Sequence, residues 1–206
     1  MRQLTMQESK KAKKMADYLG CLSQLEYNTA LLYKGLSEKT EIPLARSLLL
    51  SIAQDSSKHS ALLKGIGDSI SVSNVNSKDC SRMLGQTWQI VTNYLNEVSK
   101  NKERVSLADL CEKLMVFESG VGEEYYIFVQ MQTLQHLTKE INELYNVNLS
   151  TVKNIFESII RDEDHHRELL ATIKELNEHE SKDNNNTPIV KYQNPDRWIN
   201  YTPNNF

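Results

Sequence analysis

Apolar residues recur at helical spacing through most of the chain, and this pattern predicts helices joined by short polar segments. From about residue 7 to residue 37, leucines fall three, four or seven positions apart, so that one helix face is apolar. A second apolar stripe follows Pro43, which is tolerated in the first turn of a helix. We expect Thr40 to cap this helix and the pair Gly65 and Gly67 to end it.

Further helices are predicted after residues 68–80, a stretch rich in serine, asparagine and aspartate that reads as a loop. One covers residues 81–100. The next begins near Ser106, which with Asp109 resembles a capping pattern, and is expected to continue to about residue 145. The last helix begins at residue 148 or 150. With few glycines and prolines, these stretches indicate an all-α fold.

The chain divides into a helical domain, residues 1–180, and a C-terminal segment, residues 181–206. This segment opens on an asparagine-rich linker that cannot bury enough apolar surface to fold by itself. Its end regains aromatic residues, among them Trp198 and Phe206. Two interpretations stay open: the tail docks on the helical domain or on a neighbouring subunit, or it is disordered.

Composition and charge argue against several classes of protein. A net charge of −3 gives no electrostatic reason to expect nucleic acid as a partner, and the basic cluster at residues 10–14 is interpreted as a solvated helix face. No apolar run is long enough to span a membrane, and no secretion signal is found. Cys21, Cys80 and Cys111 form no Cys-x-x-Cys pair, which argues against a zinc ribbon and indicates reduced thiols in a cytoplasmic protein.

An internal repeat carries the candidate chemistry. Glu26 is followed by Tyr33, and Glu118 by Tyr125, seven residues later in both copies. Seven residues are about two turns of a helix, so each pair lies on one helix face. Each copy then continues into a second helix that carries histidine.

The histidine segments have the spacing of metal ligands in one copy and a defect in the other. Glu163 and His166 are three residues apart, whereas His59 is preceded at the same distance by Ser56. In four-helix bundles, a Glu from each of two helices and a Glu-x-x-His from each of the other two converge on a two-metal site. Oxygen-rich sites with one histidine per metal suit iron or manganese better than zinc.

These motifs resemble those of the ferritin-like superfamily, closest to its rubrerythrin and erythrin branch, over roughly residues 15–176. The resemblance implies a four-helix bundle of two helical hairpins, with an extra helix in the crossover and an extended C-terminal tail. It also implies a di-metal carboxylate site. Its metal ligands would be Glu26, His59, Glu118, Glu163 and His166.

The resemblance extends to the cofactor and the reaction. Two iron ions are expected, with manganese or a mixed pair as alternatives, and Tyr33 and Tyr125 match family tyrosines that line the site. The implied reaction reduces peroxide or dioxygen, or oxidises ferrous iron. Because the sequence has no cysteine pairs for a rubredoxin-like centre, electrons would come from an unidentified donor. A homo-oligomer, in the simplest case a dimer, is expected.

Ser56 is the main departure from the family pattern, because a serine hydroxyl is a poor ligand for ferrous iron. If Glu163 bridges, each metal still has three protein ligands. Asp55 could substitute for the missing carboxylate, although Asp162 at the same place in the second copy suggests a supporting role for both. A second hypothesis therefore stands beside the enzyme: a degenerate ferritin-like bundle whose partial or lost site leaves a structural or interaction module.

Overall fold

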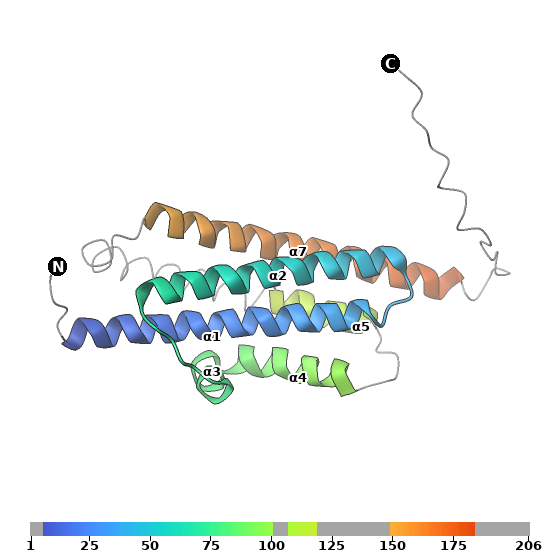
Figure 1. The fold of residues 1–206 in the computed structure, drawn as a ribbon. Coiled ribbons are helices and arrows are strands. Elements are labelled where there is room, and N and C mark those ends of the chain that lie inside the picture. Colours follow the sequence, from blue (N-terminus) through green and yellow to red (C-terminus); the bar gives the residue numbers. More distant parts are fainter. Residues whose placement is uncertain (1–5, 101–106, 119–148, 184–206) are drawn as a thin grey trace, which may run out of the picture.

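All elements that the structure describes are helices (Figure 1). The computed structural model describes residues 6–100, 107–118 and 149–183. Within these ranges the chain forms six helices, labelled α1 to α5 and α7. The search of these residues finds no helix that is long and apolar enough to cross a membrane. The expected all-α fold is confirmed for this part of the chain.

The first two helices, α1 (Met6–Ser37) and α2 (Pro43–Ile70), form an antiparallel hairpin. The Ser23 hydroxyl donates a hydrogen bond to the Ser60 carbonyl oxygen over 2.8 Å, and Gly67 packs against an earlier part of α1. Because contact partners move backward along α1 as they move forward along α2, the helices run in opposite directions. The start and end predicted for α1 are confirmed to within one residue, and Pro43 lies in the first turn of α2 as predicted.

Both ends of α2 nevertheless correct the sequence prediction. Ile42, not Thr40, holds the N-cap position, and no side chain caps the helix. Thr40 instead accepts a hydrogen bond from the Ile42 amide over 3.3 Å. The helix also continues through Gly65 and Gly67, because Gly67 serves helix packing: an added Cβ would lie 3.5 Å from a backbone oxygen of α1.

The crossover contains two helices where one was predicted at residues 81–100. They are α3 (Ser77–Leu84) and α4 (Gln86–Lys100). Gly85 separates them with a φ of 55°, a conformation that residues with a Cβ rarely adopt. The predicted loop at residues 68–80 is therefore wrong at both ends, which belong to α2 and α3.

A capping box explains why α3 starts where it does. The Asn76 side chain accepts a hydrogen bond from the Asp79 amide over 3.1 Å, and the Asp79 side chain accepts one from the Asn76 amide over 3.4 Å. This reciprocal pair satisfies donors that the first turn of a helix leaves free. The signal was present in the sequence, but the polar composition of the segment concealed it.

The second half of the fold is formed by α5 (Leu107–Val116) and α7 (Leu149–Asp183), which pack against each other, while α7 also packs against α2. The predicted start of α7 is confirmed. Its end is not, because the helix runs to Asp183 and so includes residues 181–183, the first three of the expected linker. Three predicted features lie outside the described residues: the cap at Ser106, the helix beyond residue 118 and the tail from residue 184.

Two apolar clusters form the core, and a polar layer separates them. The first contains the fully buried Leu19, Leu63 and Phe156, from α1, α2 and α7. The second contains Leu36 and Leu170, which lie further along α1 and α7. Each of these long helices is thus apolar on both sides of a polar segment, and the polar segments meet in the middle of the bundle.

Cys21 and Cys80 form a disulfide that joins α1 to α3, with a sulfur–sulfur distance of 2.14 Å. The expectation of three reduced thiols is therefore wrong; Cys111 is the free cysteine, and it is buried. No short sequence motif marks the pair, because the two cysteines meet only when α3 folds back along α1. The cytoplasmic location stays a prediction, and the cysteines no longer support it.

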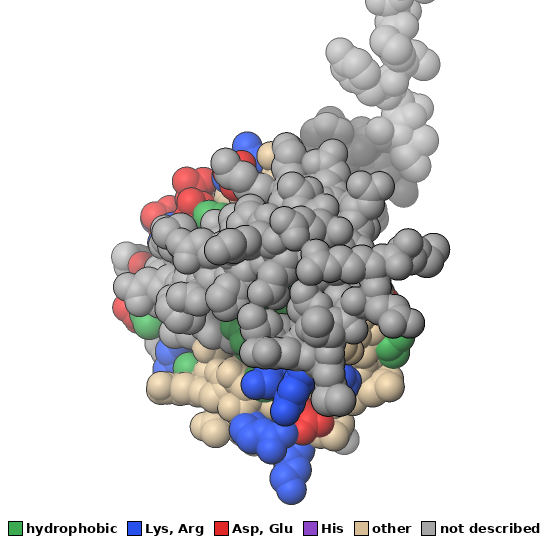
Figure 2. All heavy atoms as spheres, turned by 90° about the vertical axis from the view of Figure 1, so that its left-hand side faces the viewer, with side chains coloured by type: hydrophobic (Ala, Val, Ile, Leu, Met, Phe, Trp, Pro, Cys, Tyr) green, Lys and Arg blue, Asp and Glu red, His purple; other side chains and the backbone are tan. Residues whose placement is uncertain are grey.

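Charged side chains are spread unevenly over the end of the bundle where α1 begins (Figure 2). Lys and Arg side chains gather at the lower side of this view, and Asp and Glu side chains at the upper left. Lys10, Lys13 and Lys14 are exposed, and the Lys13 ammonium lies 3.3 Å from the Asp17 carboxylate. The solvated face predicted for the basic cluster is confirmed at these three positions.

Replacing both Cys21 and Cys80 by serine is expected to lower the free energy of unfolding by about 4 kcal/mol. The disulfide joins residues 59 positions apart and so restricts the unfolded chain strongly. Urea denaturation measures the change. A reductant should destabilise the native chain by a similar amount and leave the double variant unchanged; equal stability of the oxidised and reduced native chain would contradict the bond.

Candidate metal centre

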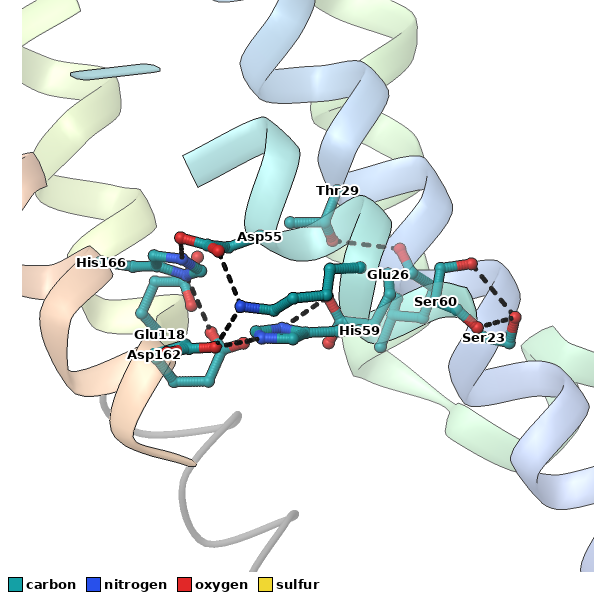
Figure 3. Close-up of polar contacts among 12 residues, drawn as sticks. Ser23, Glu26, Thr29, Asp55, His59, Ser60, Glu118, Asp162 and His166 are labelled. Carbon is teal, nitrogen blue, oxygen red and sulfur yellow. Dashed lines mark hydrogen bonds and ion pairs between the residues drawn. The ribbon is translucent and has the colours of Figure 1, made fainter. Parts of the chain in front are cut away.

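The residues predicted as metal ligands all lie in the polar layer between the two apolar clusters. Each is 7% exposed or less. Figure 3 shows Glu26, His59, Glu118 and His166 converging from different helices. The set comprises Glu26 on α1, His59 on α2, Glu118 just after α5, and Glu163 and His166 on α7.

Glu26, His59 and Glu163 form a first group with the geometry to hold a cation. One ligand atom from each lies within 4.8 Å of the others. His59 Nδ1 is 3.1 Å from Glu163 Oε1 and 3.8 Å from Glu26 Oε2. The imidazole thus directs the same nitrogen toward both carboxylates.

A second group comprises Glu118, Glu163 and His166, again with one ligand atom from each within 4.8 Å of the others. His166 Nδ1 lies 3.4 Å from Glu163 Oε2. Glu163 therefore belongs to both groups, and each of its oxygens faces a different imidazole. This placement matches the arrangement expected from the sequence, in which Glu163 makes up for the missing carboxylate at position 56.

Several buried atoms in these groups lack a hydrogen-bond partner. They include Nδ1 of His59, Nδ1 of His166 and Oε1 of Glu163. An unpaired buried polar atom costs about 1–3 kcal/mol, so their presence side by side requires a reason. A divalent cation between them would bind these atoms once the His59 imidazole has given up its proton, and carboxylate oxygen with imidazole nitrogen is a ligand set that suits iron or manganese. The residues therefore fit the implied metal.

Burial and mutual charge determine which of these groups carries a proton. Burial, with the nearby Glu163 charge, raises the pKa of Glu118 well above its usual range. Burial also disfavours an ionised Glu163, but its contacts with Glu118 and the two histidines lower its pKa overall. Burial disfavours a charged His59, yet Glu163 and Glu26 raise its pKa to about 10. The raised pKa of Glu118 favours its protonated form, and a cationic His59 faces an anionic Glu163.

Tyr33 connects the first copy of the repeat to the second. Its hydroxyl donates a hydrogen bond to the Glu118 carboxylate. Burial and the Glu118 charge raise the pKa of Tyr33 well above its usual range, so the phenol remains a proton donor. The structure places Tyr33 at the site, while Tyr125 lies outside the described residues. The functional role of both stays a prediction.

Asp55 does not join either group of candidate ligands, and Ser56 is buried. Asp55 Oδ2 instead lies 3.6 Å from Nε2 of His166, on the side of the ring away from Glu163. Asp162 Oδ2 lies 2.9 Å from Nε2 of His59. Each aspartate thus supports the histidine of the opposite helix, which favours a supporting role for Asp55 over substitution for a ligand.

Two features of the site were missed by sequence reasoning. Lys58 Nζ lies 2.8 Å from both Asp55 and Asp162, and nothing in the repeat marks it, because the second copy has the exposed His165 in its place. In addition, the helix widens into a π-helical turn where it presents Glu118. Such turns are frequent at functional sites.

Comparison with models of protein families, with curated proteins and with solved structures finds no match.

Cation binding at this centre is expected to release at least one proton per chain at pH 7, because the ligating forms are neutral imidazole and ionised carboxylate. His59, with a pKa of about 10, holds a proton beforehand, and the raised pKa of Glu118 favours release of a second. A pH indicator in weakly buffered solution measures the release during titration with Mn²⁺, and affinity should rise with pH. His59→Gln should release about one proton fewer; binding without proton release would contradict this protonation pattern.

Proposed function

We propose that this chain is a ferritin-like four-helix protein of the rubrerythrin type with a di-metal carboxylate site. It holds two iron ions, with manganese or a mixed pair as alternatives, and it reduces peroxide or dioxygen or oxidises ferrous iron. The observation that carries the proposal is Glu163, whose two oxygens face the Nδ1 atoms of His59 and His166 at 3.1 and 3.4 Å. A carboxylate shared between two such groups is typical of a bridged pair of metals.

The burial of negative charge supports two cations rather than one. Glu26, Glu118 and Glu163 place three carboxylates in a layer nearly closed to water. Ionised carboxylates are costly there unless cations compensate them. In the ligating state, with His59 neutral and all three carboxylates ionised, one divalent ion leaves a carboxylate uncompensated. Two ions compensate all three, and their remaining positive charge faces Asp55 and Asp162 behind the histidine rings.

The residues would divide between the two ions around the shared Glu163. Glu26 and His59 would hold one ion, and Glu118 and His166 the other. Iron held there would supply electrons to a small oxidant such as peroxide or dioxygen, or would accept them from further ferrous iron. An external electron donor and a homodimeric assembly complete the proposal.

The surrounding residues would orient the ligands and exclude water. Tyr33 donates to Glu118 and so orients this carboxylate and keeps a proton inside the site. The apolar clusters on both sides of the layer limit access of water to the centre. In the first copy the smaller, buried Ser56 side chain stands where the second copy has a carboxylate.

A second function is favoured by one observation, the replacement of a ligating carboxylate by Ser56. In that alternative the chain is a degenerate ferritin-like bundle with a partial or lost metal site, and it acts as a structural or interaction module. The two functions differ in the number of ions that the protein retains.

Protein loaded anaerobically with ferrous iron and freed of excess metal is expected to retain about two ions per chain, because two groups of ligands share Glu163. Elemental analysis measures the ratio. Glu163→Gln should reduce it to one or none, since both groups lose their common carboxylate. Glu175→Gln, an exposed change on the same helix, is the matched control and should leave the ratio unchanged. Absence of bound metal in the native protein would support the degenerate bundle instead.

Ser56→Glu is expected to raise metal affinity by about tenfold or more, because it restores a carboxylate three residues before His59. The same variant should be less stable without metal, since it buries another carboxylate. Competition with a coloured chelator and thermal unfolding provide the two measurements. Ser57→Glu places the new charge on the exposed side of the same helix and serves as the control. Unchanged affinity in Ser56→Glu would indicate that the first copy does not bind metal.

A further inference from the structure

A layer of charged side chains lies between solvent and the two histidine rings. Lys58 Nζ lies 2.8 Å from Asp55 Oδ1 and 2.8 Å from Asp162 Oδ2, so that one ammonium group bridges α2 and α7. The side chains of Asp55 and Asp162 are 30% and 27% exposed, and that of Lys58 is 48% exposed. All three side chains are therefore accessible to solvent, whereas the candidate ligands are buried.

The same two aspartates also face inward. Asp162 Oδ2 lies 2.9 Å from His59 Nε2, and Asp55 Oδ2 lies 3.6 Å from His166 Nε2 (Figure 3). The His166 side chain is wholly buried, and its Nε2 has no hydrogen-bond partner. An unpartnered buried nitrogen thus faces the Asp55 carboxylate. The two aspartates form a continuous polar connection from solvent to the rings that face Glu163.

We propose that Asp55 and Asp162 form an outer site where a divalent cation from solvent first binds, in the position that the Lys58 ammonium holds. This inference rests on the proposed function, because the cation is the one that the inner residues would then receive. Lys58 acts as a tethered competitor: it compensates the two carboxylates until a cation of higher charge displaces it.

Electrostatics explains why displacement is favourable. Two carboxylates attract a divalent ion about twice as strongly as a monovalent ammonium at equal distance. Displacement of Lys58 costs little free energy, because ion pairs of exposed side chains contribute little to stability. The lysine side chain is long and flexible, so its ammonium can move into solvent without any movement of α2.

A cavity elsewhere along α2 is a second place where a cation could enter, and a lysine beside it provides a control position. A cavity of about 150 Å³ lies between α1, α2 and the loop that follows α2, and its lining includes Ser23, Lys64 and Asp68. Lys64 pairs with Asp68 over 2.6 Å, and Ser23 bonds to the backbone of Ser60, next to His59. Lys64 is thus an exposed lysine on the same helix as Lys58, in an ion pair beside a different opening.

The test measures how fast metal-free protein takes up Co²⁺ at low ionic strength, by stopped-flow absorbance. Lys58→Met should bind Co²⁺ about three- to tenfold faster, because the competitor is removed from the outer carboxylates. Lys58→Arg keeps the charge and should remain close to the native rate. Lys64→Met should also remain close to the native rate, and an acceleration there instead of at Lys58 would place entry at the cavity and overturn the proposal.

A double-variant comparison separates local competition from a general effect of charge. In a background of Asp55→Asn and Asp162→Asn, uptake should be slower than in the native chain, and Lys58→Met should then change nothing. If Lys58→Met accelerates uptake equally in that background, its effect is long-range repulsion and the outer site is refuted. Unchanged or slower uptake in Lys58→Met alone also overturns the proposal.

The final stoichiometry distinguishes this inference from the proposed function. If the native chain and Lys58→Met both reach about two ions at saturation but at equal rates, the inner site stands and the outer site fails. If neither chain binds Co²⁺ at any concentration tested, the proposed function fails and the outer site fails with it.

Discussion

The free-energy cost of burying charge is the constraint on which the rest of this structure depends. Three carboxylates and two imidazoles lie between two apolar clusters, where an unpaired ion is strongly unfavourable. The protein lowers this cost in two ways. Glu118 keeps its proton because its pKa is raised, and His59 pairs with Glu163. Both arrangements leave ligand atoms facing one another, so the stabilisation of the metal-free fold also prepares the site for a cation.

The two copies of the repeat are alike in the aspartates around the centre but differ in the ligands within it. Asp55 and Asp162 occupy equivalent positions, and each contacts the outer nitrogen of the opposite histidine. The inner ligands are asymmetric, because Glu163 has Ser56 as its counterpart. Glu163 sits between the two imidazoles, so a single carboxylate can serve both halves. Because Glu163 is shared, the centre still has two groups of ligands although the first copy has Ser56 instead of a carboxylate.

Sequence reasoning reached the helical fold, the bounds of α1 and the start of α7, because these depend on periodicity within one helix. The full set of five candidate ligands came from the family resemblance, and the structure brings these residues into two groups. It failed where a residue's role depends on another helix. Gly67 was interpreted as a helix end, yet its small size lets α1 approach α2. The polar start of α3 concealed a capping box. Cys21 and Cys80 are far apart in sequence, and only the return of α3 along α1 brings them together.

The sequence by itself determined which side chains could share a helix face, because the 3.6-residue period relates positions three, four and seven apart. That was sufficient to pair Glu163 with His166 and Glu26 with Tyr33. Only the tertiary structure decided that Tyr33 bonds to Glu118, that each aspartate supports the opposite histidine, and that Lys58 joins α2 to α7. These contacts depend on how each helix is rotated about its axis and shifted along it relative to its neighbours. The packing of the two apolar clusters determines this rotation and this shift.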